Sequence, residues 1–179
     1  CDEIKIECLS RGLELVCNDP DIPTDKDNLV IRAAHILQTR YPDRCKGARI
    51  HLNKNIPHGA GLGGGSGNAA GVLLGLNYLW GLKLKREDLI SMASELGSDV
   101  PFFLFSPCAI GRGRGEILEP VKSSIRFYIL MVYPGFAVST ASVYGNLKLK
   151  LTKRENNISI LKNFLLKSEF AQLGATWSN

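Results

Sequence analysis

The sequence lacks the segments that would place the protein in a membrane or mark it for export. No stretch of its 179 residues reaches the about 18 consecutive apolar residues that a membrane-spanning helix needs. The first residues, CDEIK, have neither the basic start nor the apolar core of a signal peptide. We therefore expect no membrane partner and a bacterial cytoplasmic location, with a plastid location left open.

Cysteine and histidine are too scattered for a disulfide framework or a zinc site. The chain has five cysteines, an odd number without any C-x-x-C pair, which is typical of free thiols in a reducing compartment. The three histidines, His35, His51 and His58, do not show metal-ligand spacing. The sequence therefore predicts no metal site built from protein ligands alone.

A basic stripe of the kind that binds nucleic acid is also missing. The net charge is +5, but the 22 lysines and arginines are spread along the chain without interleaved aromatic residues. We expect no nucleic-acid partner. The charge fits a solvated surface or an anionic small-molecule substrate.

Strand and helix patterns occupy the first hundred residues. Alternating apolar and polar residues predict strands at Glu3–Leu9, Leu13–Cys17 and Arg49–Lys54. A turn at 10–12 separates the first two strands. Helical spacing of apolar residues predicts helices at Leu29–Arg40, Ala69–Trp80 and Lys85–Leu96. Asp27 or Asn28 can cap the first of these helices. The second helix is apolar on nearly all sides, which predicts burial. Without a strict alternation of strands and helices, the pattern favours an α+β fold.

The C-terminal part carries weaker signals. An unbroken apolar run predicts a central strand at Phe127–Tyr133, a helix can begin in Ser139–Tyr144, and Ile158–Leu173 has an amphipathic helical pattern. Neither end of the sequence completes a structural unit. We expect a fragment with an N-terminal domain at 1–125, truncated at its start, and the beginning of a second α+β domain at 126–179.

The most informative stretch is a glycine-rich loop within Lys54–Ala70. Six of the nine residues in 59–67 are glycine. Each glycine in a regular element costs roughly 0.5–1 kcal/mol relative to alanine, so a cluster indicates that backbone must approach a ligand. A strand leads into the loop and an apolar helix follows it, and helix N-termini bind phosphate through free amides. The stretch predicts a nucleotide-phosphate site.

Two general phosphate-loop motifs do not explain this stretch. The P-loop needs Gly-Lys-Ser/Thr, which does not occur in the loop. The dinucleotide pattern G-x-G-x-x-G is matched by residues 59–64, but its acidic partner about 20 residues on would have to be Glu87 or Asp88, at the start of a helix.

A third pattern, Pro-x-x-x-Gly-Leu-Gly-x-x-Ser from Pro57 to Ser66, resembles the GHMP kinase superfamily of small-molecule kinases. The resemblance is closest to one member, which phosphorylates the 2-hydroxyl of a diphosphocytidyl derivative of methylerythritol in the non-mevalonate isoprenoid pathway. Four motifs of that member occur here in the same order and with the same spacing. They are N-L-V-x-R-A-A from Asn28, the glycine-rich loop Lys54–Ala70, G-S-D-V-P-F-F from Gly97 and G-x-G-x-G-E from Gly111.

The resemblance implies a GHMP-kinase fold with ATP and Mg²⁺ as cofactors. It assigns nucleotide binding to the loop and to two positions near the adenine, which are Asn28, Lys54, Pro57, His58, Gly59, Ala60, Gly61, Leu62, Gly63, Gly64, Gly65, Ser66 and Gly67. Ser66 could add a hydroxyl to phosphate or Mg²⁺, while Gly67 stands where relatives usually have a second serine. The alternatives are that His58 is a bystander within the loop and that the whole loop is a structural element packed tightly against a helix.

Asp99 is the residue that the resemblance assigns to chemistry, as general base or charge stabiliser. Its neighbours Val100–Phe103 suggest an apolar environment, and the alternative is an aspartate that only caps the next turn. The resemblance assigns the acceptor to Arg114, Thr140 and Tyr144, with Tyr144 stacking on the cytosine. A surface arginine and a half-buried helix tyrosine are the alternatives. The family's catalytic lysine and cytidine-gripping aromatic–histidine pair would precede Cys1.

The sequence thus predicts an ATP-dependent kinase for a small molecule, an alcohol-acceptor phosphotransferase, and gives no oligomeric state. Another GHMP kinase, such as a homoserine kinase, and a non-catalytic nucleotide-binding fragment remain as alternatives. Because the lysine position is missing, we expect the 179 residues alone to be inactive.

Overall fold

The computed structural model describes residues 1–113, 115, 117–122, 128–133, 135–136, 145–146 and 162. The elements follow the chain in the order β1 (Glu3–Leu9), β2 (Leu13–Cys17), α1 (Leu29–Arg40), β3 (Gly47–Asn53), α2 (Gly64–Leu79), α3 (Arg86–Leu96), α4 (Val100–Phe105), β4 (Ala109–Arg112) and β5 (Ile117–Pro120). This mixture confirms the predicted α+β class.

The first three strands form one mixed sheet in the order β1-β3-β2. β3 lies between the other two, antiparallel to β1 with Ile6 opposite Ile50, and parallel to β2 with Leu15 opposite Ile50. β1 and β2 therefore do not pair with each other, although only a short turn separates them. That turn passes over the start of β3, where the Ala48 amide donates to the Gly12 carbonyl at 2.9 Å.

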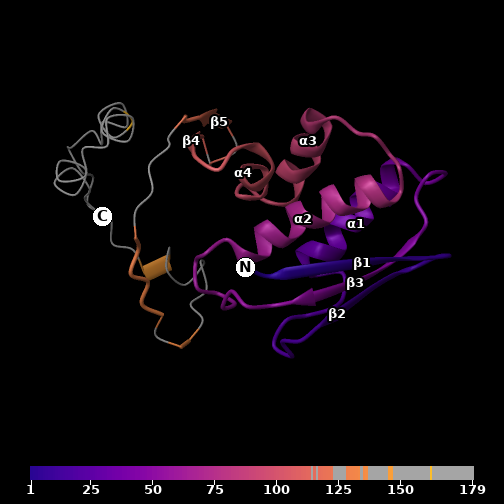
Figure 1. Ribbon diagram of the computed structural model, residues 1–179, viewed down its shortest axis with the longest axis horizontal. Helices are drawn as coiled ribbons and strands as arrows, with labels where there is room; N and C mark the ends of the chain where they lie inside the picture. Colours follow the sequence, from indigo (N-terminus) through magenta and orange to yellow (C-terminus); the bar gives the residue numbers. More distant parts are fainter. Residues whose placement is uncertain are drawn as a thin grey trace.

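Helices cover one face of this sheet in two layers (Figure 1). α1 and α2 pack on the sheet and on each other, and α3 and α4 lie on the far side of α2. The core fills the space between these layers with apolar side chains, of which Leu37, Ile50, Leu73, Leu76 and Met92 are among the largest that are fully buried. The alternating pattern of β3 places Ile50 and Leu52 on the helix side, where both are buried in the core.

α2 differs from its prediction at its start and on one face. It begins at Gly64, five residues before the predicted Ala69, so the second half of the glycine loop is helical. α2 is buried on one side only, because the side chains of Leu74, Tyr78 and Leu79 are exposed while those of Val72 and Leu73 are buried. The helix is thus held by one apolar face rather than enclosed.

The helix ends follow the predicted signals in two cases. Asn28 caps α1, since its side-chain oxygen accepts the Val30 amide at 2.8 Å. α3 stops at Gly97, as expected, but that glycine has an extended backbone (φ 172°) rather than a left-handed one. A short helix, α4, follows directly after Asp99 and had no separate prediction.

Gly113 and Gly115 of the G-x-G-x-G-E motif lie in the turn of the β4–β5 hairpin, which packs beside α4 (Figure 1). The predicted central strand at Phe127–Tyr133 is wrong for the described residues 128–133, which have no strand structure and are exposed. An apolar run becomes a central strand only where strands flank it on both sides, and none of the described strands does so. The predicted helix start in Ser139–Tyr144 and nearly all of Ile158–Leu173 lie outside the described residues.

Buried hydrophobic residues in the described part end at Val121. The proposed boundary near residue 125 stays a prediction. Among the described helices, none combines the length and apolar composition needed to cross a bilayer.

The crowded crossing at the start of β3 gives a test of the fold. A Cβ on Gly47 would lie 2.4 Å from the backbone carbonyl carbon of Arg11, which cannot move aside as a side chain can. We expect Gly47→Ala to lower the free energy of unfolding by about 1–3 kcal/mol, measured by urea denaturation.

Gly97→Ala is the matched control for this change. Its Cβ would meet Val100 at an ordinary 3.7 Å, and its φ suits any residue. Equal stability losses in the two variants would contradict the steric account of Gly47.

Candidate active site

The glycine loop turns sharply into the N-terminus of α2. Gly59, Gly61 and Gly63 have φ values of 69°, 72° and 68°, a region that residues with a side chain rarely adopt. Gly63 is the N-cap of α2 and its carbonyl accepts the Gly67 amide at 2.8 Å. The N-cap offers no side-chain bond, so the first amides of the helix, Gly64–Ser66, face outward as donors with a positive dipole end.

These amides open onto a cleft of about 390 Å³ between the loop and the start of α1. The cleft brings together nearly all residues predicted to bind nucleotide, which are Asn28, Lys54, Pro57, His58, Gly59, Ala60, Gly61, Leu62, Gly63, Gly64, Gly65 and Ser66. Gly67 is the exception, because it does not line this cleft, and its assignment to nucleotide binding stays a prediction. It lies on another side of α2, where a Cβ would be 3.4 Å from the ring of Phe103.

Asn28 and Lys54 line the cleft, but their side chains have local partners. The Asn28 amide nitrogen donates to the Pro23 carbonyl at 2.7 Å while its oxygen caps α1. Lys54 Nζ forms a buried ion pair with Asp2, and the two side chains are only 6% and 3% exposed. Lys54 therefore brings a compensated charge to the cleft rather than a free cation.

Asp2 is a residue that the sequence analysis missed. Its carboxylate accepts hydrogen bonds from Lys54 Nζ, from the amides of Asn55 (2.8 Å) and Ile56 (2.7 Å), and from Asn68 Nδ2 (2.9 Å). Burial of the carboxyl raises its pKa, but the bond from Lys54 and then the other three donors outweigh that effect and lower the pKa to about 2. The alternating pattern of the first strand gave no signal for this, because the partners are more than 50 residues away.

Asp99 lines the cleft, and its carboxylate forms no hydrogen bond or ion pair with the described part of the chain. It occupies the N-cap position of α4 but makes no side-chain cap bond, so the alternative of a mere capping residue is not supported. The expectation of an apolar environment is wrong, because Asp99 is exposed while Val100 and Pro101 beside it are buried. Its carboxylate faces the β4–β5 turn, where a Cβ on Gly115 would be 3.9 Å from Oδ1.

Asp99 also lines a second hollow of about 340 Å³, formed with the β4–β5 hairpin and α4. The two hollows share the loop segment Gly61–Gly63 and Asp99 itself. Of the residues predicted for the acceptor, Arg114, Thr140 and Tyr144 lie outside the described residues. The described lining of this second hollow comes from the glycine loop, Asp99, α4 and the β4–β5 hairpin.

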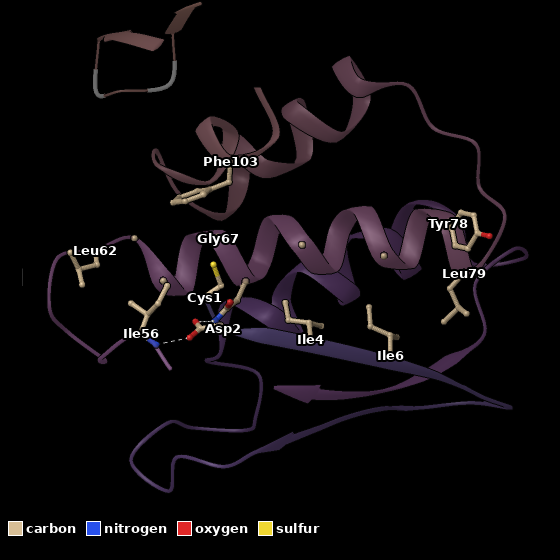
Figure 2. A pocket seen from close by; sticks show the side chains of 15 residues that line it. Cys1, Asp2, Ile4, Ile6, Ile56, Leu62, Gly67, Tyr78, Leu79 and Phe103 are labelled. Atoms are coloured by element: carbon tan, nitrogen blue, oxygen red, sulfur yellow. Dashed lines mark hydrogen bonds between the residues drawn. The ribbon is translucent and has the colours of Figure 1, made fainter. Parts of the chain in front are cut away.

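A larger groove of about 710 Å³ runs between β1 and α2 (Figure 2). Ile4 and Ile6 point into it from β1, Tyr78 and Leu79 lie at one end, and Phe103 lies above the start of α2. This groove is the larger, but it is an unsuitable phosphate site. Its lining is mainly apolar and its charged side chain, Asp2, is anionic. The smaller cleft carries the amides and the uncommitted carboxylate.

No cluster of three or more metal-ligating side chains occurs among the described residues. Mg²⁺ in nucleotide sites commonly takes one or two protein oxygens together with phosphate and water, so this finding concerns only an all-protein metal cage. The cleft residues with a hydroxyl or carboxylate oxygen suited to such a role include Ser66, Asp27 and Asp99.

Comparison with known proteins identifies the domain. The model of the family described as "GHMP kinases N terminal domain" matches residues 28–107, which span the loop, α2 and Asp99. The solved structure of a 4-(cytidine 5'-diphospho)-2C-methyl-D-erythritol kinase superposes with a TM-score of 0.69 and 33% identity, covering 93% of this chain and 59% of that one. A homoserine kinase from Cytophaga hutchinsonii has a TM-score of 0.71 but 20% identity, which shows a shared fold alone.

Curated relatives are closer in sequence. The 4-diphosphocytidyl-2-C-methyl-D-erythritol kinase of Chloroherpeton thalassium is 48% identical over 140 residues, which cover 78% of this chain and 49% of the relative. The enzyme of the same name from Desulfotalea psychrophila is 44% identical over 159 residues, covering 87% and 53%. This chain therefore spans about half the length of the curated relatives it matches.

The bonds to Asp2 predict a specific acid dependence of stability. Its pKa falls from 3.8 to about 2 on folding, so its contribution is complete above pH 4 and is lost as the pH falls through about 2. This corresponds to about 2 kcal/mol. In urea unfolding, the stability difference between the unmodified protein and Asp2→Asn should shrink by that amount between pH 5 and pH 2. Parallel stability curves over this range would contradict the assignment.

Proposed function

We propose that this chain, which belongs to the GHMP kinases through its N-terminal domain, is part of an ATP-dependent kinase for 4-diphosphocytidyl-2-C-methyl-D-erythritol. The whole protein transfers the γ-phosphate of ATP to the 2-hydroxyl of that acceptor. The observation that carries the proposal is the position of Asp99, which lines both the cleft with the glycine loop and the adjoining hollow. The acceptor assignment is supported by identities of 44–48% to relatives of that name.

The donor side of the reaction uses backbone rather than side chains. The outward amides of Gly64–Ser66 and the α2 dipole suit the triphosphate, and the left-handed glycines let the loop curve around it. We place the base and ribose beside Asn28 and Pro23, at the α1 side of the same cleft. ATP thus fits a cradle built from backbone amides and left-handed glycines.

The acceptor side uses the carboxylate of Asp99. Phosphoryl transfer depends mainly on positioning and charge stabilisation, so one oriented carboxylate can serve as the acceptor's partner. Asp99 accepts the hydrogen bond of the substrate hydroxyl and takes its proton as the phosphoryl group arrives. Its freedom from a capping bond leaves both oxygens available for this task.

Mg²⁺ supplies charge neutralisation of the phosphates when it is bound with ATP. Ser66, whose hydroxyl lines the cleft beside the loop amides, would hold it. Arg114, Thr140 and Tyr144 remain the proposed contacts to the diphosphocytidyl group, and His58 a proposed contact to ATP. The proposed location is the cytoplasm of a bacterium.

Asp99→Asn tests the assigned base in the full-length protein. Without a carboxylate the hydroxyl has no proton acceptor, and we expect kcat to fall by about 10²–10⁴-fold while the Kd for ATP stays within about threefold. Steady-state kinetics and calorimetric ATP titration measure the two quantities. Asp43→Asn, an exposed loop carboxylate outside both hollows, is the control. Unchanged kcat in Asp99→Asn would remove Asp99 from the mechanism.

The acceptor is tested by a coupled ADP-release assay with three candidate substrates. The full-length protein should turn over 4-diphosphocytidyl-2-C-methyl-D-erythritol, and CMP or CDP should protect it from proteolysis. Homoserine and mevalonate should give no turnover above the ATPase background. A preference for homoserine would leave the GHMP fold intact and overturn the acceptor.

A further inference from the structure

We infer that Asp2 is a positioning residue for the nucleotide loop, fixing its entry and its exit so that the first amides of α2 face the cleft. The inference rests on the proposed function, because the loop concerned is the one assigned there to ATP. Asp2 itself lines the apolar groove and does not line the nucleotide cleft. It therefore acts through the loop and not on the nucleotide.

The carboxylate connects two segments that flank the loop. Oδ1 accepts the amides of Asn55 and Ile56, which lead into the loop, and Figure 2 draws the bond to Ile56. Oδ2 accepts Lys54 Nζ and Asn68 Nδ2, and Asn68 belongs to the second turn of α2. One rigid group thus sets the separation between residue 56 and residue 68 across the loop.

Few hydrogen bonds hold the loop itself, although the ring of Phe103 lies close to Gly63. Between Pro57 and Ser66, no side chain forms a hydrogen bond with any described residue. Apart from the bonds within α2, the backbone bond in this region joins Gly67 to Gly63. A glycine-rich segment loses more conformational entropy on ordering than any other. Its apparent affinity for a ligand therefore scales with the fraction of molecules in which its ends are already set.

The bonding pattern requires a carboxylate. All four partners are donors, and a carboxylate offers two oxygens that can each accept two bonds. Asparagine would offer one oxygen and direct an NH₂ group toward donors. It would also leave the buried Lys54 ammonium without its acid partner. Asp2→Asn is thus a nearly isosteric change that removes the function of the group.

The experiment compares ATP affinity in the full-length protein with and without this carboxylate. Calorimetric titration with ATP should give a Kd raised by at least about tenfold in Asp2→Asn. The KM for ATP should rise with it, while kcat falls less, because the amides bind phosphate in both the ground state and the transition state. Glu3→Gln, the neighbouring exposed carboxylate on β1, is the matched control and should leave the Kd unchanged.

A second pair of variants separates loop positioning from the loss of the ion pair. Lys54→Met removes the buried cation, and Asp2→Asn is then added in that background. If Asp2 positions the loop through its amides, the added change still raises the Kd for ATP by about fivefold or more. If the effect vanishes in this background, or if folded Asp2→Asn binds ATP normally, the inference is overturned. The Lys54→Met pair keeps the test valid should Asp2→Asn alone fail to fold.

The measurements of ATP binding and of turnover test the two proposals separately. A full-length protein that binds ATP but phosphorylates no diphosphocytidyl acceptor overturns the proposed function, and the Kd comparison still decides the role of Asp2. A protein that binds no ATP overturns both.

Discussion

The nucleotide loop depends on a buried ion pair at its base. Burying the charges of Asp2 and Lys54 is costly, and an ion pair in such a place is often no better for stability than apolar residues of the same size. The additional donors explain what the carboxylate does there. By accepting Asn55, Ile56 and Asn68 as well, Asp2 joins the end of β3 to α2. The pair belongs to the wall between the apolar groove and the nucleotide cleft.

A second constraint is the space that the glycines leave empty. Gly63 requires both a left-handed backbone and the absence of a side chain, since a Cβ would lie 2.8 Å from the ring of Phe103. The same ring lies against Gly67 at a contact distance that leaves little room. α4 therefore supports the loop from one side through Phe103. Asp99 directly precedes the first residue of the same helix. The support of the loop and the position of the carboxylate come from the same short helix.

The sequence predicted the local elements well where their signals were local. The bounds of β1, β2 and α1 follow from alternation, helical spacing and the Asn28 cap, and the structure has them at the predicted residues. The start of α2 was missed because glycine has a low helix propensity. The first turn of this helix packs closely against Ile56 and Phe103, and such tertiary contacts override propensity.

Contacts between segments far apart in the chain could not be predicted from these local patterns. The insertion of β3 between β1 and β2, and the bonds from Asp2 to residues 54–68, join segments far apart in the chain, and nothing in the periodicity of either segment reports its partner. The strand predicted at Phe127–Tyr133 shows the opposite error, in which an apolar run was interpreted without its sheet. For the site, the glycine loop and Asp99 were found from their motifs, while Asp2 and the displaced position of Gly67 required the structure.

The central claim is that ATP is bound by the backbone of the loop and meets its acceptor at Asp99. The most direct measurement is the amide ¹H–¹⁵N spectrum of the full-length protein, titrated with ATP and, separately, with CMP. ATP should shift the amides of Gly63–Ser66, and CMP those of the β4–β5 turn near Gly115, with Asp99 affected by both. Shifts from ATP that spare Gly63–Ser66 and fall along the groove of Ile4 and Ile6 would contradict the account.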